Sequence, residues 1–154
     1  MKKLSWRYLA GLIDGEGCID VQVTKRKGYE TFNIRPRLRI TFTSPGADVI
    51  KLLQNNYGGN ITYRTPENPK WLPSCTWEMA GYKANKVLRN VKNALIVKKE
   101  QARFCLWMEE NIKGKQVGQE ALNACRDELK LMKRDSHRLS EKAQSRVMAM
   151  IEKR

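Results

Sequence analysis

The chain is poor in the residues on which many enzymes and metal sites depend, since its 154 residues include one histidine and four cysteines. Cys18, Cys75, Cys105 and Cys125 are far apart and form no C-x-x-C pair, so a zinc site lacks ligands and we expect reduced, mostly buried thiols. Because His137 stands alone near the C-terminus, sites that need several histidines lack them, and the composition disfavours Ser-His-Asp and Cys-His catalysis.

Long apolar runs are also missing. No stretch of 18 or more apolar residues could cross a membrane. No basic amphipathic helix presents a wide aromatic face, and residues 1–4 lead into a helix rather than into an export signal. We therefore expect an intracellular protein, in the cytoplasm of a prokaryote or in an organelle, with no membrane partner and no small-molecule cofactor.

Acidic residues are few relative to basic ones. Thirty Lys and Arg against sixteen Asp and Glu give a formal net charge of +14. The excess is spread along the chain instead of lying in a tail, which indicates a polyanionic partner, and nucleic acid fits better than a membrane surface. At this length we expect one domain, residues 1–154.

The hydrophobic periodicity predicts an α+β domain. Ser5 is a suitable cap for the first helix. The predicted helices cover 6–13, 48–56, 83–94, 98–111, 118–134 and 140–153, and the predicted strands cover 19–26, 35–43, 60–65 and 74–80. The expected architecture is an antiparallel, saddle-shaped sheet with helices on one face, in the αββαββα order.

One predicted strand, 35–43, alternates Arg35, Arg37 and Arg39 with apolar residues. The facing strand offers a single carboxylate, Asp20, so we expect the polar face to stay positive. Such a two-stranded ribbon fits the major groove of DNA and spans roughly 30 Å, or about nine base pairs. An ordinary solvated face is the alternative. The predicted DNA-binding residues are Asp20, Gln22, Thr24, Arg26, Arg35, Arg37, Arg39, Thr41, Thr43, Asn60, Thr62, Arg64, Thr76 and Glu78.

Residues 9–17, LAGLIDGEG, form an apolar helical turn that ends in two carboxylates, Asp14 and Glu16. Carboxylates at the end of a buried helix require a cation or a proton. The stretch resembles the signature of the LAGLIDADG homing endonucleases. Residues 9–14 match it unchanged, and Glu16 stands where the family usually has its second aspartate.

The resemblance implies a homodimer, because this chain carries one motif and family members with one motif act as dimers. Two copies of the motif helix would pack side by side and bring their carboxylates to the two-fold axis. The implied interface residues are Tyr8, Leu9, Ala10, Gly11, Leu12 and Ile13. The resemblance assigns a Mg²⁺ (or Mn²⁺) ligand role to Glu16, helped by the carbonyl of Gly15. Asp14 looks more like a structural residue, with direct metal contact as the alternative.

Residues 95–102 resemble the family segment that carries an active-site lysine, which would be Lys98, with Lys99 as a competitor. The implied catalytic residues are thus Glu16, Lys98 and Asp14. The segment 44–48 departs from the family pattern, because it is short and offers no glutamine or arginine. Thr43 and Ser44 are the remaining candidates for positioning water.

The resemblance implies a site-specific, metal-dependent DNA endonuclease. It would bind a long, roughly palindromic duplex as a homodimer and cut both strands across the minor groove, leaving short 3′ overhangs. The alternative functions are an intron maturase and a non-cleaving, sequence-specific nucleic-acid-binding protein. The acidity of Glu16 favours cleavage, because a pure binder gains nothing from a carboxylate that faces phosphate.

Overall fold

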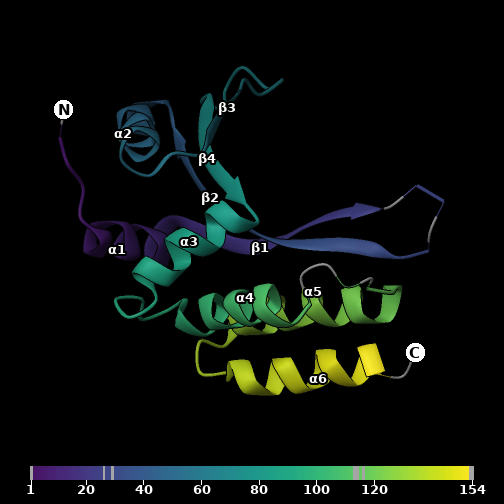
Figure 1. The fold of residues 1–154 in the computed structure, drawn as a ribbon. Helices are drawn as coiled ribbons and strands as arrows, with labels where there is room; N and C mark the ends of the chain where they lie inside the picture. The colour runs from purple at the N-terminus through teal and green to yellow at the C-terminus, as the bar shows by residue number, and fades with distance from the viewer. Residues whose placement is uncertain (1, 26, 29, 113–114, 116, 153–154) are drawn as a thin grey trace.

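The computed structural model describes residues 2–25, 27–28, 30–112, 115 and 117–152. It confirms the α+β class with one antiparallel sheet, and Figure 1 shows the arrangement. The elements in chain order are α1 (Trp6–Glu16), β1 (Gly17–Lys25), β2 (Phe32–Thr43), the 3-10 turn η1 (Ser44–Gly46), α2 (Ala47–Tyr57), β3 (Asn60–Arg64), β4 (Ser74–Ala80), α3 (Tyr82–Val91), α4 (Lys99–Asn111), α5 (Gln119–Arg134) and α6 (Ser140–Glu152). Arg26, the predicted end of the first strand, and Lys153, the predicted end of the last helix, lie outside the described residues.

The four strands are ordered β1-β2-β4-β3, and every neighbouring pair is antiparallel. The long hairpin of β1 and β2 extends beyond the shorter β3 and β4 and reaches over the C-terminal helices (Figure 1). Its inner side chains are apolar, and Leu38 and Ile40 are fully buried. The predicted alternation therefore holds along β2, with one side in the core and the other open to solvent.

The pair Gly58 and Gly59 ends α2 and lets β3 start close to the core. Both have positive φ, which suits glycine. A Cβ on Gly59 would lie 2.7 Å from Nε1 of Trp77, which donates to the carbonyl of Gly58 at 2.6 Å. The glycine pair thus gives the buried Trp77 ring both its space and its hydrogen-bond acceptor.

Helix α1 starts at the predicted cap, where the Ser5 hydroxyl accepts from the backbone N–H of Tyr8 at 3.0 Å. It continues three residues past the predicted end at Ile13, because the backbone of Gly15 and Glu16 remains helical even though the apolar pattern has stopped. Gly17 ends the helix, and a Cβ there would lie 2.8 Å from the Ile13 carbonyl oxygen. The chain therefore passes from α1 into β1 without a loop.

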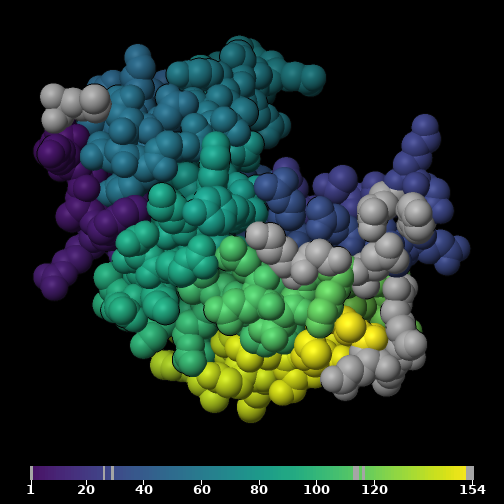
Figure 2. Space-filling model, in the orientation of Figure 1, coloured from purple at the N-terminus to yellow at the C-terminus, as the bar shows by residue number. Residues whose placement is uncertain are grey.

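Helices α4 and α5 pack against one side of the sheet, and α6 packs on α4 and α5 farther from the strands (Figure 1). Figure 2 shows α6 along the outer edge of the molecule. Glu128 on α5 is fully buried and accepts from Arg138 at 2.6 and 2.8 Å and from Arg146 at 3.2 Å. This carboxylate ties the loop before α6 and α6 itself to α5.

Three of the four free cysteines, Cys75, Cys105 and Cys125, are buried, and Cys18 is half-buried. Burial raises the pKa of the Cys125 thiol to about 12, so it stays protonated and unreactive. Among the described residues, no helix is both long and apolar enough to cross a membrane.

Candidate active site and DNA-facing surface

The carboxylate of Asp14 caps the start of α4. Its Oδ2 accepts from the backbone N–H of Ile96 at 2.8 Å, and its Oδ1 accepts from those of Val97 and Lys98 at 3.1 and 2.9 Å. These three N–H groups belong to the cap residue Lys98 and to the two residues before it, and a negative charge at the start of a helix is favourable. Asp14 therefore joins the end of α1 to the start of α4, 84 residues later in the chain.

Lys98 is the cap residue of α4, and its side chain turns back to α1. Its Nζ donates to the backbone carbonyl of Asp14 at 2.8 Å, and the residue is 9% exposed. Burial lowers the pKa of Lys98 below its usual 10.5, and the charge of Asp14 offsets part of this shift. The neighbouring Lys99 is exposed. The structure thus distinguishes two adjacent lysines that the sequence left as competitors.

Glu16 is the last residue of α1, and both Glu16 and Gly15 are exposed. A carboxylate and a backbone carbonyl are hard oxygen ligands, which suit Mg²⁺. Within the described part of one chain, no group of three or more His, Cys, Asp or Glu residues could hold a metal ion. The donors therefore fit an ion that keeps several waters and takes further ligands from phosphate, and they do not fit a closed protein cage.

The outer face of α1 is open. Tyr8 is 46% exposed, and a Cβ built on Gly11 or Gly15 would meet nothing within 4 Å. Leu12 lies half-buried beside them. These residues follow the 3.6-residue helical period and form one stripe.

The six interface residues expected from the sequence divide into two groups. Tyr8, Gly11 and Leu12 belong to the open stripe. Leu9, Ala10 and Ile13 are 0% exposed in the core of their own chain, so they have no surface for a partner. The small residue beside Gly11 on the open stripe is Gly15, whereas Ala10, which was expected at the interface, is buried.

The polar side of the sheet is less positive than the sequence suggested. Asp20 lies opposite Arg37 in the register of β1 and β2, and it also reaches Arg39. The ion-pair distances are 2.8 Å from Arg37 and 3.0 Å from Arg39. One carboxylate therefore engages two of the three arginines, which leaves Arg35 as the exposed one.

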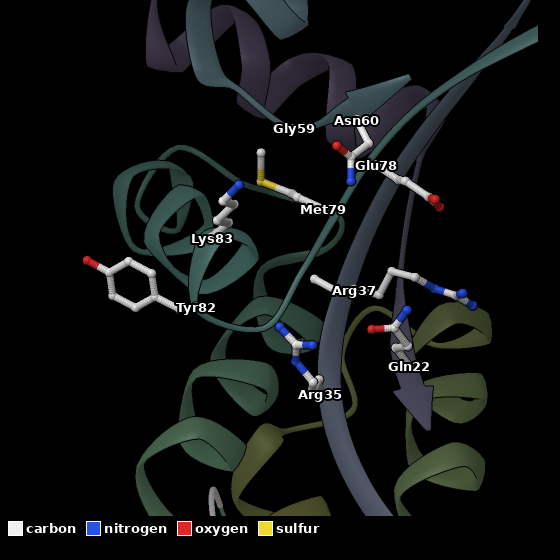
Figure 3. A pocket seen from close by; sticks show the side chains of 10 residues that line it. Gln22, Arg35, Arg37, Gly59, Asn60, Glu78, Met79, Tyr82 and Lys83 are labelled. Carbon is white, nitrogen blue, oxygen red and sulfur yellow. The ribbon is translucent and has the colours of Figure 1, made fainter. Parts of the chain in front are cut away.

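Arg35 lies at a cavity of about 410 Å³ on this side of the sheet. Its guanidinium passes over Gly81, where a Cβ would lie 2.5 Å from an Nη atom, and the positive φ of Gly81 favours glycine at this turn. Figure 3 shows Arg35, Arg37 and Gln22 on the strands. Tyr82 and Lys83 line the cavity from α3, and the ring of Tyr82 points away from the arginines. The sequence prediction missed Tyr82 and Lys83, because they follow the predicted strand and look like an ordinary helix start.

The register aligns the other predicted DNA-binding residues in rows across the sheet. Thr41, Thr76 and Thr62 form one row, and the hydroxyls of Thr41 and Thr76 lie 2.7 Å apart. Arg39, Glu78 and Asn60 form the next row. All of the predicted set that the structure describes is exposed or half-buried: Asp20, Gln22, Thr24, Arg35, Arg37, Arg39, Thr41, Thr43, Asn60, Thr62, Arg64, Thr76 and Glu78. Arg26 lies outside the described residues.

Three further cations stand beside the β1 edge of the sheet. Arg126, Lys130 and Lys133 are exposed on one stripe of α5. Together with Arg39 and Cys18 they line a cavity of about 530 Å³. The sequence favoured some phosphate-contacting lysines on the C-terminal helices but did not single out these three residues, although their i, i+4, i+7 spacing was visible.

Comparison with known proteins is consistent with this geometry. A family model described as LAGLIDADG endonuclease matches residues 9–111. The chain therefore belongs to the LAGLIDADG endonuclease family. It is a DNA-cleaving hydrolase of the homing-endonuclease type.

Solved structures share the fold at low sequence identity. The homing endonuclease I-CvuI, solved with its target and calcium, is 18% identical with a TM-score of 0.63, covering 94% of this chain and 93% of that one. The archaeal intron-encoded homing endonuclease I-Vdi141I, complexed with DNA, is 17% identical with a TM-score of 0.61, covering 94% and 95%. I-TnaI is 17% identical with a TM-score of 0.54, covering 97% and 99%. Comparison with curated proteins gives no match.

Proposed function

We propose that the protein is a site-specific homing endonuclease that acts as a homodimer, requires a divalent metal, and cuts both strands of a long, roughly palindromic duplex. The observation that carries the proposal is the contact between the end of α1 and the start of α4. Asp14 on α1 is hydrogen-bonded to the buried Lys98, and the exposed Glu16 lies two residues beyond Asp14. An exposed acid next to a buried cation suits a hydrolytic site on phosphate better than a purely binding surface.

The proposed partner is a second copy of the chain, packed on the open stripe of Tyr8, Gly11, Leu12 and Gly15. The two glycines present bare backbone to the partner, which permits helix axes to approach to about 8–10 Å. Such an approach would bring both copies of Glu16 to the dyad. The single-motif family match and the unfilled helix face support this assembly.

Glu16 and the carbonyl of Gly15 are the proposed ligands of Mg²⁺, with Mn²⁺ as a substitute. When bound, a divalent ion supplies an activated water and stabilises charge on the transferring phosphate. I-CvuI has been crystallised with DNA in the presence of magnesium or calcium. The exposure of Glu16 leaves room for a phosphate and for waters in the remaining ligand positions.

Lys98 is the proposed cation beside the scissile phosphate. Its bond to the Asp14 carbonyl fixes the ammonium group at the end of α1, two residues from Glu16. A fixed positive charge in a partly dry site stabilises developing negative charge more strongly than a solvated one. Asp14 would act on the reaction through Lys98, by fixing the backbone on which this side chain stands. Thr43 and Ser44, both exposed, stay candidates for orienting water.

The polar sheet side would read the major groove, and the stripe of Arg126, Lys130 and Lys133 would contact backbone phosphates at the β1 edge. Each protomer would cover about nine base pairs, so the dimer would recognise a long site. Two active sites at the dyad, about one minor-groove width of 6 Å apart, would leave short 3′ overhangs.

A plasmid-cleavage assay tests the proposal. The substrate is a supercoiled library carrying randomised inserts of about 20 base pairs, incubated with and without Mg²⁺. We expect metal-dependent linearisation of a subset of inserts, and loss of cutting by at least about 100-fold in Glu16→Gln with DNA binding retained. Glu110→Gln, an exposed change on α4, is the matched control and should cut normally.

Three results would contradict the proposal. Cutting that survives in Glu16→Gln would remove the metal role of this residue. Sequence-specific DNA binding without cutting by the native chain would favour a non-cleaving regulator, and metal-independent RNA binding without cutting would favour a maturase.

A further inference from the structure

The hydrogen bonds of Asp20 differ from those expected of a side chain that reads DNA. Its Oδ1 accepts from Nε of Arg37 at 2.9 Å, and its Oδ2 accepts from Nη2 of Arg37 at 2.8 Å and from Nη2 of Arg39 at 3.0 Å. A carboxylate has about four acceptor positions, so most of the acceptor capacity of Asp20 is already in use inside the protein. A base that donates to Asp20 would have only the remaining acceptor position, unless one of these charge-assisted hydrogen bonds broke.

Both arginines keep N–H donors that Asp20 does not use, although the Nε of Arg39 is buried without a partner. A guanidinium has five N–H donors. Arg37 gives two of them to Asp20 and Arg39 gives one. The side chains of Arg37 and Arg39 remain 26% and 37% exposed. The hydrogen bond that Arg37 donates to Asp20 also raises the pKa of Arg37 above its usual value, so this guanidinium stays charged.

The pairing changes what the two arginines can do. A guanidinium that moves freely binds any phosphate within reach, whereas one held in a fixed plane offers its donors at a set position and angle. Bidentate recognition of guanine through O6 and N7 requires such a fixed geometry. Partial neutralisation by Asp20 also weakens attraction to the uniform charge of the phosphate backbone.

We propose that Asp20 is a positioning residue for sequence recognition, which holds the guanidinium groups of Arg37 and Arg39 toward the base edges and cancels one of their two charges. This inference rests on the proposed function, in which this side of the sheet binds DNA. Asp20 lies four residues beyond Glu16 on β1, which corresponds to about 13 Å or roughly four base pairs from the cleavage centre. A change at Asp20 should therefore alter recognition of the base pairs at that distance from the cleavage centre.

The test uses the full chain and duplexes randomised over about 20 base pairs, with bound sequences read to give the discrimination at each position. Asp20→Asn removes the charge and keeps the shape, and Asp20→Glu restores the charge on a longer side chain. Glu110→Gln adds the same unit of positive charge on α4, away from the sheet. Thermal unfolding of each variant checks that the fold is retained.

For Asp20→Asn we expect tighter binding to non-specific DNA and a slope of log K against log salt that is steeper by about 0.9, because a freed guanidinium takes up a phosphate. Discrimination falls about tenfold at base pairs roughly four from the centre and changes less than about twofold elsewhere. Asp20→Glu should restore the native salt slope but only part of the native sequence discrimination. Glu110→Gln should change neither the slope nor the discrimination.

Three outcomes would overturn the inference: unchanged discrimination in Asp20→Asn, an equal loss at all positions, or a loss at a single cytosine with no change of slope. The last would make Asp20 a direct base contact. A native chain that binds every duplex equally would overturn the proposed function instead, so the two failures are distinguishable.

Discussion

Asp14 and Lys98 are joined by two reciprocal hydrogen bonds. The Asp14 carboxylate accepts from the backbone N–H of Lys98 at 2.9 Å, and the Lys98 ammonium donates to the backbone carbonyl of Asp14 at 2.8 Å. Each residue thus caps the helix of the other, because the end of a helix lacks donors and the start lacks acceptors. The pair fixes the acidic end of α1 relative to the first turn of α4.

This relationship separates the roles of Lys98 and Lys99. Lys98→Met should reduce cleavage by at least about 100-fold while target binding changes little, because the cation beside the phosphate is lost. Lys99→Met, on the exposed neighbour, should cut at near the native rate. Single-turnover cleavage with saturating enzyme measures the chemical step, and a titration of labelled duplex measures binding. Equal defects in the two variants would remove the special role of Lys98.

The open stripe of α1 makes a separate prediction about assembly. Gly11→Val should leave each chain folded, since a Cβ at Gly11 meets nothing within 4 Å, but it should keep the two helices apart. We expect sedimentation to give the mass of one chain and cleavage of both strands to be lost. Ala149→Val, an equally exposed small-to-valine change on α6, is the control. A native chain that sediments as a monomer even on DNA would contradict the dimer.

The basic stripe of α5 should contribute to affinity without contributing to specificity. Lys130→Gln and Lys133→Gln should each weaken binding at all sequences alike and reduce the salt slope by about 0.9, because each would remove one phosphate contact. Lys142→Gln, an exposed change on α6, should leave the slope unchanged. Binding isotherms at four or more salt concentrations give the slopes. A change in the preferred sequence would instead place these lysines against bases.

The buried Glu128 predicts how stability depends on pH. The hydrogen bond from Arg138 holds the pKa of Glu128 below its usual 4.5, against the opposing effect of burial. A lowered folded-state pKa means that its stabilisation is complete above about pH 4.5 and is lost as the pH falls through the folded-state value. At pH 7, Glu128→Gln should lower the free energy of unfolding by about 1–3 kcal/mol, because two arginines lose their charged acceptor.

Urea unfolding between pH 3 and pH 7 measures this dependence. The loss of stability toward low pH should be smaller in Glu128→Gln than in the native chain. Asp127→Asn is the control, because Asp127 is 53% exposed and makes one bond of 3.3 Å to Arg146, so its loss should change stability by less than about 0.5 kcal/mol. Parallel pH profiles in the native chain and Glu128→Gln would assign the acid sensitivity to other groups.

Much of the fold could be predicted from periodicity. The burial pattern of β2 follows the alternation seen in the sequence, and Ser5 caps α1 as expected. The end of α1 was predicted too early, because the hydrophobic signal stops at Ile13 while the backbone hydrogen bonds continue to Gly17. Apolar periodicity reports which residues are buried, and the last exposed turn of a helix carries no such signal.

The candidate site could be located from the sequence but not resolved. The motif at residues 9–17 identified Asp14 and Glu16. Their surroundings differ because α4 packs against the end of α1, where Asp14 is hydrogen-bonded to its start and Glu16 stays exposed. The same holds for Lys98 and Lys99, which are equivalent as neighbours in a sequence and differ in burial. The contact between Asp14 and Lys98 joins residues 84 positions apart in the chain. Such a contact depends on the packing of the whole chain, so no short stretch of sequence predicts it.

The sequence by itself determined the family, the basic character of the polar face of β2 and the position of the acidic motif, because these depend on residue type and short-range spacing. The tertiary structure decided which face of α1 remains open, that Asp20 engages Arg37 and Arg39, and that three cations of α5 stand beside β1. Strand register and helix packing set these relations. They are fixed by burial of apolar surface summed over distant segments, which no single window of the chain contains.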